Sequence, residues 1–164
     1  MKKVLILACG ALLFATSCLD GGNSYDTSSA TYNGTVTVTD IDTGDVSYSD
    51  DKASITVIIP NIIEPKCDIV FNNIKFDVMM PQLNIKLAGV PFTSTVSEDE
   101  SSINYIFEAQ NIVPTIGDIK YEKYKVTTIE GCIGKIVDVI FEIESKEKRV
   151  HFTTAKESVE TTEN

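Results

Sequence analysis

The residue types that most often carry out catalysis are sparse in this sequence, and their spacing matches none of the common catalytic motifs. His151 is the only histidine. It alternates with Val150 and Phe152 in a predicted strand, so we expect its side chain to face outward. A general base also needs a nucleophile or a second base placed beside it. The sequence contains no Gly-x-Ser-x-Gly elbow, His-Glu-x-x-His motif or phosphate-binding glycine loop. We therefore predict a protein that is not an enzyme and has no cofactor.

A group of aspartates in two neighbouring turns is the one pattern that suggests a metal ion. Asp40, Asp42 and Asp45 fall in the first turn, and Asp50 and Asp51 fall in the second. Carboxylates at alternate positions can converge on calcium, but an EF-hand loop needs Gly at its sixth position and Glu at its twelfth. Counted from Asp40, those positions hold Asp45 and Asp51. We keep Asp40, Asp42 and Asp45 as a weak calcium candidate and expect ordinary acidic hairpin turns.

The first 18 residues have the pattern of an export signal. Two lysines precede the apolar run 4–14, and small residues and Cys18 follow it. A membrane-spanning helix needs about 20 apolar residues, whereas a run of about 10–14 suits the apolar part of a signal peptide. We therefore predict a signal peptide over 1–17 and a flexible, Gly- and Ser-rich tether over 18–30. An ordinary signal that is cut nearby and leaves Cys18 as a spare thiol is the alternative.

The four residues that end at Cys18 resemble the lipobox of bacterial lipoproteins. They are Ala15-Thr16-Ser17-Cys18, and the usual lipobox has Leu where this chain has Ala15. The resemblance implies cleavage before Cys18, a diacylated thiol, and often an acyl chain such as palmitate on the new amine. It also implies an outer-membrane protein, lipid-anchored through Cys18, that faces the periplasm or the cell surface. Two or three acyl chains are enough for stable anchoring.

The charge balance argues against nucleic acid as a partner. The whole chain carries a net charge of −10, and loss of the two lysines in residues 1–17 takes it to −12. Binding to nucleic acid requires clustered Lys and Arg that face phosphates. The same negative charge disfavours electrostatic attachment to anionic lipid, so the acyl chains must provide the link to the membrane.

Two cysteines remain after the signal peptide and the lipidation site are set aside. They are Cys67 and Cys132, and each stands near the start of a predicted strand or turn. An oxidising compartment permits a disulfide between them. Two cysteines at this separation have no characteristic spacing, so a bridge and two separate thiols both stay open.

Apolar and polar residues alternate in about ten short segments from Tyr32 onward. These segments are 32–39, 46–49, 53–59, 68–76, 83–87, 92–96, 103–109, 124–129, 137–144 and 150–154. The alternation slips at Asn72–Asn73, where we expect a bulge or a sharp bend. Residues 111–121 form the longest irregular connection, and no helical periodicity is present in the mature chain.

These segments predict an all-β domain over 31–154, followed by a disordered tail over 155–164. Because each strand has one apolar face, we predict a single enclosed interior, as in an up-and-down barrel. A β-sandwich is the alternative. Pairing between the first and last strands distinguishes the two folds.

The order of strands and corners is similar to that of the calycin-like lipoproteins of Bacteroides-type bacteria. The resemblance covers roughly residues 32–152. It rests on Tyr32-Asn33-Gly34-Thr35, the segment 68–76, the Met80-Pro81 corner, Gly89-Val90-Pro91-Phe92 and Asn111-Ile112-Val113-Pro114. It implies an antiparallel, up-and-down, eight-stranded, lipocalin-like barrel on a lipid anchor, and it supplies no substrate and no catalytic residue.

Six apolar side chains are candidates for lining the barrel: Met79, Met80, Phe92, Tyr105, Phe107 and Phe141. An eight-stranded barrel either fills with side chains or holds one small ligand. We predict a small apolar ligand if the structure has a contiguous cavity of roughly 300 Å³ or more. The alternative is an envelope interaction or structural module that engages a protein partner through the outer loops 40–51, 97–102 and 111–121.

Overall fold

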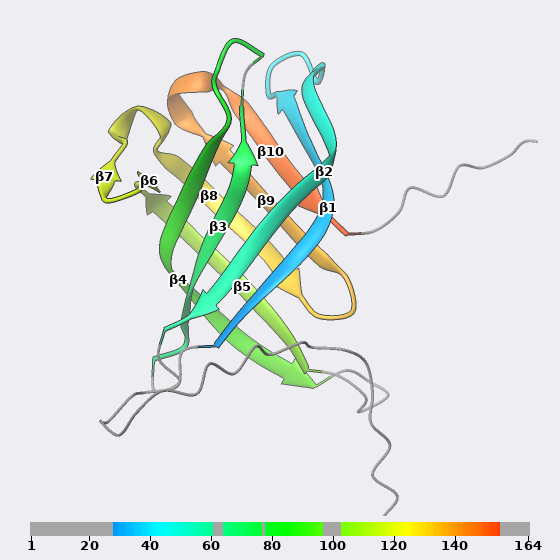
Figure 1. The fold of residues 1–164 in the computed structure, drawn as a ribbon, viewed down its shortest axis with the longest axis vertical. Coiled ribbons are helices and arrows are strands. Elements are labelled where there is room, and N and C mark those ends of the chain that lie inside the picture. Colours follow the sequence, from blue (N-terminus) through cyan, green and yellow to red (C-terminus); the bar gives the residue numbers. More distant parts are fainter. Residues whose placement is uncertain (1–27, 61–63, 77, 97–102, 155–164) are drawn as a thin grey trace, which may run out of the picture.

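Eight strands, each paired antiparallel with the strands before and after it in the wall, close into a barrel (Figure 1). They are β1 (Ser28–Asp40), β2 (Val46–Ile59), β3 (Lys66–Ile74), β4 (Leu83–Val96), β5 (Ile103–Ile112), β8 (Val126–Ile133), β9 (Val137–Ile143) and β10 (Lys148–Thr153). The pairing of β1 with β10, from Thr35 opposite Thr153 to Asp40 opposite Lys148, closes the sheet on itself. That pairing excludes the sandwich and confirms the predicted eight-stranded up-and-down barrel.

This computed structural model describes residues 28–60, 64–76, 78–96 and 103–154. The predicted signal peptide over 1–17, the lipidation site Cys18 and the predicted tail over 155–164 lie outside the described residues. Most of the predicted tether also lies outside them. Its last three residues, 28–30, instead belong to β1, where Ala30 pairs with Val57 of β2. The barrel therefore begins three residues earlier than the sequence pattern indicates.

Two pairs of short predicted strands are single long strands in the structure. Segments 46–49 and 53–59 are both part of β2, because register shifts against β1 absorb the extra residues and keep Asp50 paired with Val36. Segments 83–87 and 92–96 are both part of β4. There Gly89 has φ of +68°, which suits glycine, and the strand continues through it. Leu83–Pro91 pairs with β3, and Phe92–Val96 pairs with β5.

The expected irregularity at Asn72–Asn73 is confirmed. The β3–β4 register shifts between Phe71 and Ile74, and Asn73 has φ of 51°, in the left-handed region that asparagine tolerates. The Asn73 backbone N–H donates a hydrogen bond of 2.9 Å to Oδ1 of Asn84. The slip in alternation thus corresponds to a bend that the next strand stabilises.

The long connection after β5 contains short elements of its own. β6 (Thr115–Ile116) pairs with β4 at Lys86, and β7 (Ile119–Lys120) forms a small hairpin with β6. A 3-10 turn, η1 (Glu122–Tyr124), leads into β8, and a second, η2 (Glu144–Lys146), connects β9 to β10. Neither of these short helical turns, and nothing else helical in the described residues, could span a membrane.

The alternating side chains of the wall fill most of the barrel interior. All of the buried side chains among the described residues are apolar or cysteine. Phe71 and Phe141 meet edge to face with ring centroids 5.0 Å apart, and Phe76 lies 5.6 Å from Phe141. Because β3 and β9 are not neighbours in the wall, these rings cross the interior and close it at that level.

Candidate functional site

One end of the barrel contains an apolar pocket of about 80 Å³. This is the end at which β1 starts, β2 ends and the β4–β5 hairpin projects (Figure 1). The lining residues are Ser28, Ser29, Ala30 and Tyr32 of β1, Val57 and Ile59 of β2, Cys67 of β3, Phe92 of β4, Tyr105 and Phe107 of β5, and Ile133 of β8. Six strands therefore contribute, and the pocket exists only because the sheet is closed.

The pocket is electrically neutral as well as apolar, since its lining contains no Asp, Glu, Lys, Arg or His. Burial, with a smaller effect from Tyr105, raises the pKa of the Tyr32 hydroxyl, so this phenol keeps its proton at neutral pH. Burial first, and then the charge of Asp68, raises the pKa of the Cys67 thiol to about 12. The rings of Phe92 and Tyr105 meet edge to face at 5.3 Å and form one side of the site. Such a lining suits a neutral apolar group that carries at most one polar atom.

Three of the six predicted lining residues belong to this pocket, namely Phe92, Tyr105 and Phe107. Phe141 faces inward but packs in the core, where it is 1% exposed. Met79 and Met80 lie in the turn between β3 and β4, at the opposite end of the barrel, and the Met79 side chain is 90% exposed. The two methionines do not line this pocket, because a turn at one barrel end cannot reach a pocket at the other.

The sequence interpretation missed Tyr32, Cys67 and Ile133 as lining residues. Each has the inward parity of its strand and lies near the strand terminus at the pocket end. In an up-and-down barrel, the first residues of odd strands and the last residues of even strands meet at one end. The inward or outward alternation of each strand, combined with a residue's position along that strand, would therefore have identified these three residues.

The cavity volume decides against a ligand enclosed within the barrel. At about 80 Å³ the pocket is well below the 300 Å³ expected for such a site. The interior beyond it is occupied by the core, including Phe71 and Phe141. Only a small molecule, or one end of a longer apolar molecule, fits.

Cys67 and Cys132 are both free thiols in the structure, so no bridge joins them. Cys67 faces the interior and is 2% exposed. Cys132 has the opposite parity to its inward neighbours Ile129 and Ile133, and it lies on β8, which β4 and β5 separate from β3. The barrel wall stands between the two sulfur atoms. Of the two alternatives left open above, the structure has the pair of separate thiols.

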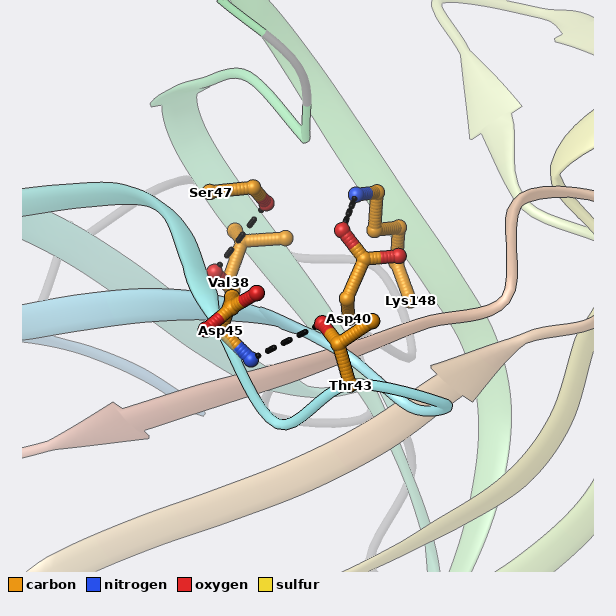
Figure 2. Close-up of polar contacts among 6 residues, drawn as sticks. All are labelled: Val38, Asp40, Thr43, Asp45, Ser47 and Lys148. Atoms are coloured by element: carbon orange, nitrogen blue, oxygen red, sulfur yellow. Dashed lines mark hydrogen bonds and ion pairs between the residues drawn. The ribbon is translucent and has the colours of Figure 1, made fainter.

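The acidic turn between β1 and β2 does not assemble the calcium candidate (Figure 2). The carboxylate of Asp40 pairs with Nζ of Lys148 at 2.5 Å, and the backbone N–H of Asp45 donates to the Thr43 hydroxyl at 3.2 Å. Asp42 is exposed. In the part of the chain that the structure describes, no three acidic, His or Cys side chains are grouped as a metal site would require. The turn is instead closed by backbone bonds and one ion pair.

His151 faces outward, as its position in the strand predicts. Its Nε2 lies 3.1 Å from Oδ2 of Asp138 on the neighbouring strand β9, and its side chain is 40% exposed. In the register of the wall, Cys132 stands opposite Asp138. The order across the outer surface is therefore Cys132, Asp138, His151, with the carboxylate between the thiol and the imidazole. A cysteine nucleophile needs the imidazole beside it, so this arrangement does not form a catalytic pair.

Comparisons of this chain with protein-family models, with curated proteins and with solved structures found no match. The resemblance to calycin-like lipoproteins therefore stays a prediction. The arguments about function that follow rest on the chain and its structure.

Proposed function

We propose that this protein is a lipid-anchored component of the bacterial cell envelope that binds a small neutral apolar ligand at the end of its barrel. The anchor is Cys18, in the outer membrane, with the barrel in the periplasm or at the cell surface. The protein acts by binding and not by catalysis. The neutral pocket of about 80 Å³ between Tyr32, Phe92 and Tyr105 is the observation that carries the proposal.

The chemistry of the lining limits the ligand class. An ionised group would enter this pocket without a counter-ion, because no lining residue is charged, and burying an unpaired charge is costly. A short alkyl chain or a single small ring gains from burial at about 25 cal/mol per Å² of apolar surface. The Tyr32 hydroxyl, which burial keeps protonated, can donate to one ether or carbonyl oxygen. We therefore expect a neutral ligand, or the apolar end of a lipid-like one.

Exposed apolar side chains support a second candidate, an envelope module that binds a protein partner. Five of them lie at the barrel end opposite the pocket: Ile41, Val46, Val78, Met79 and Ile119. Two of the three loops expected to form a partner surface, 40–51 and 111–121, lie there. The third, 97–102, lies outside the described residues, and the strands that flank it end at the pocket end. The described residues therefore bring two of the three loops to one end of the barrel.

Native mass spectrometry of the protein purified from its own membrane tests the proposal. We expect the mass of a chain that starts at Cys18 and carries acyl groups, together with a bound neutral molecule of low mass. A mature chain with unmodified Cys18 would overturn the anchor. A chain that carries acyl groups and no bound molecule, even after incubation with short alkanes or alcohols, would overturn the pocket ligand.

A pair of matched variants assigns the bound molecule to the pocket. Ala30→Leu adds three carbons to a side chain that lines the cavity, whereas Ala88→Leu makes the same change at an exposed position of β4. The bound mass should disappear in Ala30→Leu and persist in Ala88→Leu. Loss in both variants, or in neither, would contradict the assignment.

A further inference from the structure

The β4–β5 hairpin extends the apolar lining of the pocket beyond the end of the barrel. Alternate residues of a strand share a face, and cross-strand pairs on that face are adjacent. On the face that lines the pocket, Phe92 pairs with Phe107, Ser94 with Tyr105, and Val96 with Ile103. Along this strip the exposure rises from 2% for Phe107 to 55% for Ile103 and 65% for Val96. The face that is core inside the barrel is therefore uncovered at the tip.

The turn between β8 and β9 adds Ile136, 49% exposed, to the same edge. A Cβ on Gly134 would collide with the side chain of Asn104, so this turn packs directly against the start of β5. Val96, Ile103 and Ile136 together form what we call the apolar rim. The rim borders the pocket through Tyr105 and Ile133, which are paired in the β5–β8 ladder. Apolar side chains that stay uncovered at the mouth of an apolar pocket extend its apolar lining to the surface.

The position of the first residue of β1 indicates what faces the rim. β1 begins at Ser28, at the pocket end, and Cys18 stands ten residues earlier. Ten residues reach at most about 33–36 Å, whatever conformation they adopt. The thirteen residues of β1 span about 43 Å along the strand, at about 3.3 Å per residue. An anchor at Cys18 therefore holds the pocket end, and not the opposite end, next to the lipid.

We propose that the apolar rim rests in the interface of the lipid bilayer, so that the pocket opens toward the membrane and takes its ligand from it. This inference depends on the proposed anchor at Cys18. The chain carries a net charge of −10, which disfavours anionic headgroups, so the partner surface is a zwitterionic one.

Single tryptophans provide a direct test, because the chain contains no tryptophan of its own. Ile103→Trp places the probe in the rim, and Ile119→Trp places it at the opposite end of the barrel, on β7. The two isoleucines are 55% and 64% exposed, so neither change disturbs the core. Each acylated variant is purified from membranes and reconstituted into phosphatidylcholine vesicles, with and without bromine on the acyl chains.

We expect the tryptophan at 103 to emit at shorter wavelength in vesicles, to resist acrylamide several-fold better than the tryptophan at 119, and to be quenched by the brominated chains. Equal behaviour of the two probes would overturn the proposal. Protection of residue 103 without quenching by brominated lipid would also overturn it, since protein would then cover the rim. Flotation of the vesicles separates this outcome from failure of the anchor. If the protein does not float with the vesicles, both the proposed anchor and the proposed docking of the rim are contradicted. If it floats but the two tryptophans behave equally, only the docking of the rim is contradicted.

Discussion

Cys67 and Cys132 differ because strand alternation places them on opposite faces of the wall. The Cys67 side chain is enclosed at the pocket by Val57, Ile59 and neighbouring rings, and burial raises the pKa of its thiol. Cys132 is half-buried on the outer surface, beside Asp138. A thiol reacts as its thiolate and only where a reagent can reach it. The two cysteines should therefore behave differently toward the same reagent.

In the mature, acylated protein we expect a maleimide to modify Cys132 in the native state and both cysteines after unfolding without reductant. Intact mass counts the adducts, and Cys132→Ser should leave no reactive thiol in the native protein. Failure of the unfolded chain to react until reductant is added would show a bridge and contradict the separate thiols.

Ionisation of Cys67 should lower stability at high pH. The unfolded thiol loses its proton near pH 9, whereas the folded thiol keeps it until about pH 12. Between these values the native state binds one more proton than the unfolded state, so the free energy of unfolding falls as pH rises. One such group contributes a slope of about 1.4 kcal/mol per pH unit.

Denaturant unfolding at several pH values between 9 and 12 measures this slope. Cys67→Val has no thiol at this position, so its free energy of unfolding should fall less steeply with pH than that of the natural chain. The difference between the two slopes isolates Cys67 from the other groups that titrate in this range. If the free energy of unfolding falls equally with pH in the two proteins, the Cys67 thiol does not control the pH dependence of stability.

At the scale of elements, glycines allow aromatic rings to lie against the wall. Gly131 of β8 pairs with Phe107 of β5, and a Cβ on Gly131 would meet the backbone carbonyl of Asp138 and lie 2.7 Å from Cζ of Phe107. Gly34 of β1 has the same relation to Phe152 and the carbonyl of Thr153. In both places the ring covers the backbone that the glycine exposes, so each glycine is needed for close approach.

We predict that Gly131→Ala lowers the free energy of unfolding by about 1–3 kcal/mol, because the added methyl collides with the backbone carbonyl of Asp138 and with the Phe107 ring. In a Phe107→Leu background only part of this loss should disappear, since the ring is gone but the contact with the carbonyl stays. Gly89→Ala is the control. Its Cβ would meet nothing within 4 Å, so its cost, which comes from φ of +68°, should be equal in both backgrounds. Chemical denaturation of the three single variants, the two double variants and the parent measures the coupling.

The elements show which sequence signals sufficed. Alternation located the apolar face of β1, β5, β9 and β10, and the slip at Asn72–Asn73 located a real bend. Alternation placed breaks at Asp50–Asp51 and near Gly89, where β2 and β4 continue. Local polarity and glycine indicate a turn, but a bulge or a change of partner strand can absorb the same residues. Only the neighbouring strands decide between these outcomes.

At the scale of the whole molecule, closure of the barrel determines how much space is left inside. Phe71 and Phe141 reach each other across the interior, and Phe76 packs on the same ring. Tyr124 of η1 extends this cluster toward the β6–β7 end, with its ring 6.1 Å from that of Phe76. These packed rings fill the middle of the barrel below the pocket, so the pocket is shallow.

Phe141→Ala should lower the free energy of unfolding by about 3–5 kcal/mol, because it removes a fully buried ring and leaves a cavity. Val46→Ala, at a position that is 62% exposed, should change it by less than about 0.5 kcal/mol. Thermal or urea unfolding of both variants gives the comparison. A small loss for Phe141→Ala would mean that the interior is not packed at this level.

By itself, the sequence determined the features that depend on neighbouring residues along the chain. These are the all-β pattern, the inward parity of Phe92, Tyr105 and Phe107, and the outward face of His151. The export signal over 1–17, with cleavage before Cys18, stays a prediction. The pairing of β1 with β10, the separation of Cys67 from Cys132 and the placement of Met79 far from the pocket were decided by the tertiary structure. The physical reason is that parity is a local property of a strand. Which residues meet at one barrel end, and how much volume their side chains leave there, depends on strands more than a hundred residues apart.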